Sequence, residues 1–251
     1  MNTLKISKTD GTAVVTLARP PVNAMDAASL EELAAAFDGL ARDDSVTAAV
    51  LTGEGRAFSA GLNLKTVPEL DLAGQRRLLA ALNDSFGVLY AWPKPLVGAI
   101  NGHAIAGGLA AALCTDWRVV ADIKLEASLA EIHVGVTFPA AALAATLGEL
   151  SPAAARRLVL LGEPLTAQEA VTLAVFDELV PADALQARAL ERARRYAALP
   201  PNAFATMKRD VRAAALERIA SARAGNDPRY GNWLGEEAKR AAAAALRRPA
   251  G

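Results

Sequence analysis

The stretch PLVGAINGHAIAGGLAAALCTDWRVVAD, residues Pro95 to Asp122, holds two apolar runs separated by a glycine-containing turn. The first run, Leu96–Ile100, has the length and composition of a buried strand. After it, a glycine-containing turn is followed by a segment rich in alanine and leucine, which predicts a helix that begins at Gly107-Gly108. The second apolar run, Trp117–Ala121, comes after this segment. Strands separated by helices of this length favour right-handed βαβ crossovers and a largely parallel sheet. The stretch therefore predicts an α/β fold.

The same stretch is long and apolar enough to raise a membrane alternative. From Pro95 to Thr115 the chain carries no acidic or basic side chain apart from His103, and this length could nominally span a bilayer. Several glycines and Asn101 interrupt it and would leave a lipid-exposed helix badly broken. We therefore interpret the stretch as buried core.

The flanking sequence extends the α/β pattern in both directions. Two strand-like runs around Asp10-Gly11 are typical of a hairpin. Asp26 stands at a predicted helix start, the run Val46–Thr52 predicts a strand that ends at Gly53, and a polar loop and then a helix within Asp71–Tyr90 follow. From Pro139 onward the pattern predicts almost only helix.

Composition narrows the class of protein. The 251 residues include 27 basic and 27 acidic side chains, so the charge balance gives no reason to expect nucleic acid or an anionic membrane as a partner. The single cysteine, Cys114, excludes an intrachain disulfide and fits a reducing compartment. The start MNTLKISKTD lacks a secretory signal pattern. We expect a globular cytoplasmic protein.

Most short catalytic motifs are missing. GHAIAGG does not match G-x-G-x-x-G, and no P-loop lysine follows it. Ser59 lies in FSAGL rather than in G-x-S-x-G, and the histidines His103 and His133 have no metal-like spacing to each other or to Cys114. These observations argue against a serine nucleophile and a zinc site, and leave little support for a nucleotide fold.

Two glycine-containing turns, each after a buried strand, remain as candidates. The loop AFSAGLNLK, Ala57 to Lys65, carries no side chain suited to acid, base or metal chemistry apart from its lysine, and the second turn precedes Gly107. Where a strand leads into a helix through glycines, backbone N–H groups are unpaired and carry the positive end of the helix dipole. Two such turns could form a hole for a carbonyl oxygen that gains negative charge. The alternative is a pair of ordinary glycine turns.

Taken in order, several motifs resemble the crotonase family, the enoyl-CoA hydratase/isomerase superfamily. They are ARPPVNAMD, AFSAGLNLK, the stretch Pro95 to Asp122, LAEIHVGVTFP, LGEPLTAQEAVTLAVFDELVP and WLGEEAKRAAAAALRR. The resemblance implies a core of repeated ββα units over residues 1–195 and a helical region, 196–251, that joins a homotrimer or a dimer of trimers. It also implies an acyl-CoA thioester as substrate, with no separate cofactor or metal, whose carbonyl lies between the N–H groups of Leu62 and Gly107.

The resemblance also places the coenzyme A contacts. Basic side chains match positions that approach the phosphates, and small residues match positions where the backbone meets the adenine. These are Arg56, Lys65 and Arg248 for the phosphates, and Ala24 and Ala60 for the adenine. For each basic residue the alternative is a solvated surface charge. Asn63 departs from the aspartate common at its position.

Two further positions bear on the reaction. Hydratases of the family hold a water between two glutamates, and the matching residues here are Ala110 and Glu131. A single carboxylate can still move a proton between C2 and C4 of an enoyl thioester, provided that burial lifts its pKa from ~4.3. The resemblance thus favours an enoyl-CoA isomerase that uses Glu131. A hydratase that uses Glu131 alone, and a catalytically silent acyl-CoA- or RNA-binding relative, are the alternatives.

Overall fold

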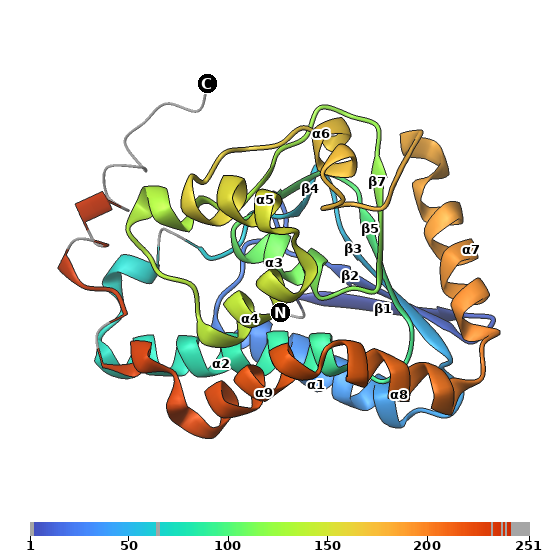
Figure 1. Ribbon diagram of the computed structural model, residues 1–251, viewed down its shortest axis with the longest axis horizontal. Helices are drawn as coiled ribbons and strands as arrows, with labels where there is room; N and C mark the ends of the chain where they lie inside the picture. The colour runs from blue at the N-terminus through green and yellow to red at the C-terminus, as the bar shows by residue number, and fades with distance from the viewer. Residues whose placement is uncertain (1–2, 64–65, 232, 237, 239, 242–251) are drawn as a thin grey trace.

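The computed structural model describes residues 3–63, 66–231, 233–236, 238 and 240–241 and centres on a six-stranded sheet (Figure 1). The strand order is β1-β2-β3-β5-β7-β9. The strands are β1 (Leu4–Thr9), β2 (Thr12–Leu17), β3 (Ala48–Gly53), β5 (Leu96–Ile100), β7 (Trp117–Ala121) and β9 (Glu178–Val180). β1 and β2 form the predicted hairpin, and all later pairs are parallel. The predicted α/β class and largely parallel sheet are confirmed.

The central strands are apolar throughout because both faces of the sheet are covered. In β3, Leu51 faces the core shared with the helices α1 (Ala27–Arg42), α2 (Leu72–Ala91), α3 (Gly107–Leu113) and α4 (Ala140–Glu149). The adjacent Val50 faces α7 (Leu185–Ala197). In Figure 1, α7 lies on one side of the large sheet and α1 to α4 lie toward the other. Such two-sided burial gives continuous apolar runs instead of alternation. The membrane alternative for Pro95–Thr115 is wrong, since this segment forms β5, β6 and α3.

A second, three-stranded sheet was not predicted from the apolar pattern, although the resemblance implied repeated ββα units. Its strands are β4 (Ala57–Ser59), β6 (His103–Ile105) and β8 (Ala127–Ser128), in that order and parallel. Each follows a strand of the large sheet and precedes a helical segment, which produces the repeated ββα units. The polar loop expected after Gly53 therefore contains a strand. β9 likewise corrects the expectation of almost only helix beyond Pro139, because it extends the parallel sheet at β7.

Helices α1 and α2 begin at aspartates whose side chains accept hydrogen bonds from their first N–H groups. Asp26 caps α1, and its carboxylate accepts from the backbone N–H of Ser29 while the Ser29 hydroxyl accepts from Asp26 N–H. Asp71 caps α2 in the same way through Gly74 N–H. The principal helices are α1 (Ala27–Arg42), α2 (Leu72–Ala91), α3 (Gly107–Leu113), α4 (Ala140–Glu149), α5 (Pro152–Ala155), α6 (Ala167–Thr172), α7 (Leu185–Ala197), α8 (Pro201–Val211) and α9 (Ala213–Ser221).

Six short helical segments complete the structure. They are η1 (Val67–Glu69), η2 (Ala130–Val134), η3 (Arg156–Leu160), η4 (Ala182–Ala184), η5 (Ala222–Asn226) and η6 (Pro228–Tyr230). No helix among the described residues is both long and apolar enough to cross a membrane.

The C-terminal helices pack onto the core rather than forming a separate body. α7 contacts β3, β5 and β7, so the boundary expected after residue 195 falls inside a helix that covers the sheet. α9 packs on α4 and α2. A buried ion-pair network anchors this region, in which Asp116 binds both Lys208 (2.8 Å) and Arg212 (3.1 Å). Asp116 is thus a structural residue.

Candidate active site

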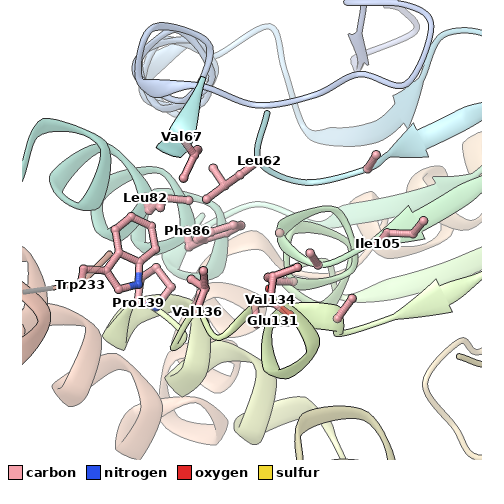
Figure 2. A pocket seen from close by; sticks show the side chains of 16 residues that line it. Leu62, Val67, Leu82, Phe86, Ile105, Glu131, Val134, Val136, Pro139 and Trp233 are labelled. Carbon is pink, nitrogen blue, oxygen red and sulfur yellow. The ribbon is translucent and has the colours of Figure 1, made fainter. Parts of the chain in front are cut away.

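One pocket lies where the two glycine turns, η2, α2 and α4 converge (Figure 2). It has an empty volume of about 710 Å³, including its open mouth. Its lining is almost entirely apolar and consists of Ala60, Leu62, Val67, Leu82, Phe86, Ile105, Ala106, Gly107, Ala110, Ala130, Glu131, Val134, Val136, Pro139, Ala142 and Trp233. Glu131 is the only titratable side chain among these lining residues. The pocket thus surrounds one carboxylate with hydrocarbon.

The absence of side chains at two glycines, Gly61 and Gly108, lets the two turns touch. A Cβ placed on Gly108 would lie 2.1 Å from the carbonyl oxygen of Ser59, which no side chain could accept. A Cβ on Gly61 would lie 2.8 Å from the Gly107 nitrogen, and Gly61 also has a positive φ of 74°. Glycine is therefore required where the loop after β4 meets the start of α3. The close contact brings Leu62 and Gly107 to one wall of the pocket.

The N–H groups of Leu62 and Gly107 are both available at this wall. Gly107 is the first residue of α3, so its N–H has no acceptor within the helix. The bridge between Met25 and Leu62 uses the neighbouring groups instead, because Met25 N–H donates to Gly61 O and Asn63 N–H donates to Met25 O. Within the described part of the chain, neither N–H donates a hydrogen bond. An anionic oxygen in the pocket would find both donors there.

Ala106, the residue before α3, has an unusual backbone conformation that affects the N–H of Gly107. Ala106 has φ 53° and ψ −124°, a conformation that costs energy for a residue with a Cβ. The strand pairing of β6 with β8 holds it there, since Ala106 N–H donates to Ser128 O at 2.7 Å. The ψ of Ala106 sets the orientation of the peptide that carries the Gly107 N–H. Strain at this residue thus serves the geometry of the proposed donor.

Two buried polar residues brace the first loop, and no sequence motif indicates their role. The Asn23 amide is buried and donates to Ala57 O (2.8 Å) and Phe58 O (3.2 Å) at β4. The Ser59 hydroxyl donates to Asn23 O (2.8 Å) and accepts from Gly61 N–H (3.1 Å). Ser59 is therefore a bracing residue of the turn, consistent with the missing nucleophile motif. Only the fold shows that Asn23 lies beside β4.

Glu131 lies in η2, opposite the glycine turns. Burial raises the pKa of Glu131 to about 7, partly opposed by a hydrogen bond from its own backbone N–H. Its Oε2 is fully buried and has no hydrogen-bond partner among the described residues. His133 is exposed and lies outside the pocket lining, with Nε2 3.1 Å from Gly162 O. Glu131 thus lines the pocket with one carboxylate oxygen that no described residue engages.

The remaining predicted contacts are distributed unevenly around the pocket. Ala60 lines it, and its N–H donates to Val22 O. Ala24 lies outside the lining, beside Met25, and its carbonyl accepts from Arg19 (3.3 Å). Arg56 is exposed and also lies outside the lining. Lys65 and Arg248 fall outside the described residues. The coenzyme A contacts therefore remain predictions.

The raised pKa of Glu131 makes a prediction about stability. Because folding raises this pKa from 4.5 to about 7, the contribution of Glu131 to folding is fully present below pH 4.5 and is lost as the pH rises through about 7. Glu131→Gln removes this titration. We expect the variant to gain up to about 3 kcal/mol in unfolding free energy over the wild type between pH 4.5 and pH 8. Urea unfolding of both proteins across this range tests it, and a difference independent of pH would contradict it.

Comparisons with known proteins show the family to which this chain belongs. A family model described as enoyl-CoA hydratase/isomerase matches residues 7–241. A probable enoyl-CoA hydratase, EchA17, from Mycobacterium tuberculosis (strain H37Rv) is 36% identical over 227 residues, which cover 86% of this chain and 84% of that protein.

Solved structures extend the likeness to the whole fold. A probable enoyl-CoA hydratase, EchA3, from Mycobacterium tuberculosis H37Rv superposes with a TM-score of 0.83 at 33% identity, covering 89% of this chain and 94% of that one. Human mitochondrial Δ3-Δ2-enoyl-CoA isomerase superposes with a TM-score of 0.90 at 28% identity, covering 98% and 97%. The chain therefore belongs to the enoyl-CoA hydratase/isomerase family and is an enzyme of the crotonase fold.

Proposed function

We propose that this enzyme is an enoyl-CoA isomerase that converts 3-enoyl-CoA to 2-enoyl-CoA. The observation that carries the proposal is the single carboxylate, Glu131, in a pocket lining that is otherwise apolar. Isomerisation requires the removal of one proton from C2 and its return at C4. One carboxylate that alternates between base and acid is sufficient for both steps.

In the proposed mechanism the thioester carbonyl accepts hydrogen bonds from the N–H groups of Leu62 and Gly107. These bonds stabilise the negative charge that moves onto the oxygen when Glu131 removes the C2 proton and a dienolate forms. The protonated Glu131 then donates the same proton to C4. Its pKa of about 7 suits both halves of this cycle, since the group is neither too weak a base nor too weak an acid near neutral pH.

The counterpart of a second glutamate is Ala110, a buried residue of α3 that lines the pocket. Hydration needs a group that orients and deprotonates water as well as one that protonates the α-carbon. The Ala110 methyl group can do neither. We infer that hydration is the slower reaction here, although several relatives are described as hydratases.

Product analysis tests this assignment. Purified enzyme is incubated separately with 3-enoyl-CoA and with 2-enoyl-CoA of several chain lengths, and the conjugated enoyl and 3-hydroxyacyl products are separated and quantified. General acid-base assistance is worth roughly 10²–10⁴, so we expect isomerisation to exceed hydration by a factor in this range. Hydration at an equal or higher rate would overturn the proposal.

We further propose that the enzyme acts in the cytoplasm as a homotrimer or a dimer of trimers, with no nucleic-acid partner. The buried free thiol of Cys114 is compatible with a reducing compartment. Exposed apolar side chains on α8, Met207 and Val211, are compatible with a subunit contact. Light scattering that shows a stable monomer at micromolar concentration would contradict the assembly.

A further inference from the structure

The pocket is exposed at one end and enclosed at the other. Leu62, Gly107 and Glu131 are each partly accessible to solvent. By contrast, Leu82, Phe86 and Trp233 are 5% exposed or less. In Figure 2, Trp233 and Glu131 lie on opposite sides of the pocket, with Phe86 and Val136 between them. A large polar group such as coenzyme A can remain at the accessible end, so an attached acyl chain extends toward Trp233.

Trp233 closes the enclosed end as a purely apolar wall. Its one polar atom, Nε1, donates to the Thr137 carbonyl at 2.6 Å and is therefore not available to a ligand. The backbone N–H of the next residue, Leu234, donates to the Gln75 side chain of α2 at 3.3 Å. These two bonds fix the indole between the segment before α4 and the helix α2. Trp233 is thus held in place independently of any ligand.

A second set of buried hydrogen bonds fixes the neighbouring wall. Asp227, which follows η5, accepts from Ala140 N–H (2.8 Å) at the start of α4 and from the Asn83 amide (3.0 Å) of α2. The Asn83 carbonyl oxygen accepts from Ala141 N–H at 3.0 Å. The first N–H groups of α4 are therefore satisfied by α2 and the C-terminal segment. This arrangement makes the end of the pocket a rigid boundary rather than a loose opening.

We propose that Trp233 is the end stop that sets the longest acyl chain the enzyme accepts, and that the pocket selects hydrocarbon chains without a charged terminus. The direction of the chain rests on the proposed function, which places the thioester at Leu62 and Gly107. Among the described residues, no basic side chain lines the enclosed end, and the one polar side-chain atom there, Trp233 Nε1, already donates to Thr137 O. A terminal carboxylate there would lose its hydration without compensation.

Binding measurements with saturated acyl-CoAs test the end stop without requiring turnover. Dissociation constants are measured by calorimetry for a series of increasing chain length. Each methylene that becomes buried improves affinity about fourfold. We expect the wild-type series to improve at this rate, then to stop improving at the length that reaches Trp233. A terminal-carboxyl analogue of the best chain is expected to bind at least roughly tenfold more weakly.

Substitution at the end stop should move that limit. Trp233→Leu is expected to extend it by about two methylene groups, because the smaller side chain leaves space that hydrocarbon can fill. Trp233→Phe should have a smaller effect and serves as the conservative variant. Trp117→Leu, at a tryptophan on β7 outside the pocket, is the matched control and should leave the limit unchanged.

The results distinguish failure of the end stop from failure of the proposed function. An unchanged limit in folded Trp233→Leu and Trp233→Phe, or tight binding of the terminal-carboxyl analogue, would overturn the end-stop proposal even if the enzyme isomerises 3-enoyl-CoA. A limit that shifts as expected in an enzyme that does not isomerise would support the end stop and overturn the proposed reaction. Near-ultraviolet circular dichroism of each variant shows that it is folded.

Discussion

Glu131→Gln is expected to reduce isomerisation of 3-enoyl-CoA by roughly 10²–10⁴, the usual worth of general acid-base catalysis. The amide keeps the shape of the side chain and cannot remove a proton from C2. Acyl-CoA affinity should remain within a few fold, because the carboxylate acts on the moving proton rather than on the coenzyme. Initial rates with 3-enoyl-CoA and calorimetry with a saturated acyl-CoA measure the two effects separately.

A matched control shows whether the loss of activity is specific to Glu131 or follows from removing a carboxylate elsewhere. Glu217 is exposed on α9 and lies outside the pocket lining, so Glu217→Gln should retain wild-type turnover. Undiminished isomerisation by folded Glu131→Gln would show that another group is the base. A large loss of acyl-CoA binding in the same variant would show that Glu131 acts in binding instead.

Gly107→Pro should lower turnover by about 10²–10³, the cost of removing one donor from an oxyanion hole. Proline has no N–H, and Gly107 occupies the first position of α3, where helices accept proline. The hydrogen bonds within α3 can therefore be kept, whereas the proline ring also restricts the backbone of Ala106, so only a folded variant is informative. Steady-state rates, with circular dichroism to verify the fold, test this expectation.

Gly107→Ala is the matched variant that keeps the N–H and adds one carbon. A Cβ at Gly107 would meet the Gly61 Cα at 3.6 Å and the Met25 sulfur at 3.8 Å, which are ordinary contact distances. The alanine variant should fold normally and retain more activity than the proline variant. Equal activity of the two folded variants would remove the Gly107 N–H from the mechanism.

Much of the large sheet could be predicted because burial on both faces leaves a clear mark on the sequence. β5 and β7 have the bounds that their apolar runs indicate, and Asp26 caps α1 as its position suggested. The strands β4, β6 and β8 were missed for a physical reason. Segments of two or three residues are too short to show a period, and their pairing depends on loops that meet only after folding.

The site was less visible in the sequence than the fold. Glycine turns indicate that backbone N–H groups are available, but not that two of them face one pocket. The two turns come together because Gly108 has no side chain. A Cβ at this residue would lie 2.1 Å from the Ser59 carbonyl oxygen. No sequence motif marks Trp233. It lines the pocket because its indole N–H is held by the carbonyl oxygen of Thr137, which is distant in the chain. The resemblance supplied Glu131, whereas its burial and raised pKa come only from the structure.

The central claim is that one carboxylate carries a proton from C2 to C4, and isotope transfer tests it most directly. A 3-enoyl-CoA that carries deuterium at C2 is converted in ordinary water by excess enzyme in a single turnover, and the 2-enoyl-CoA product is analysed by mass spectrometry and NMR. Glu131 Oε2 is buried in an apolar pocket, which slows exchange with solvent. We predict deuterium at C4 of the product. A 2-enoyl-CoA product without deuterium at C4, or a 3-hydroxyacyl product in its place, would contradict the account.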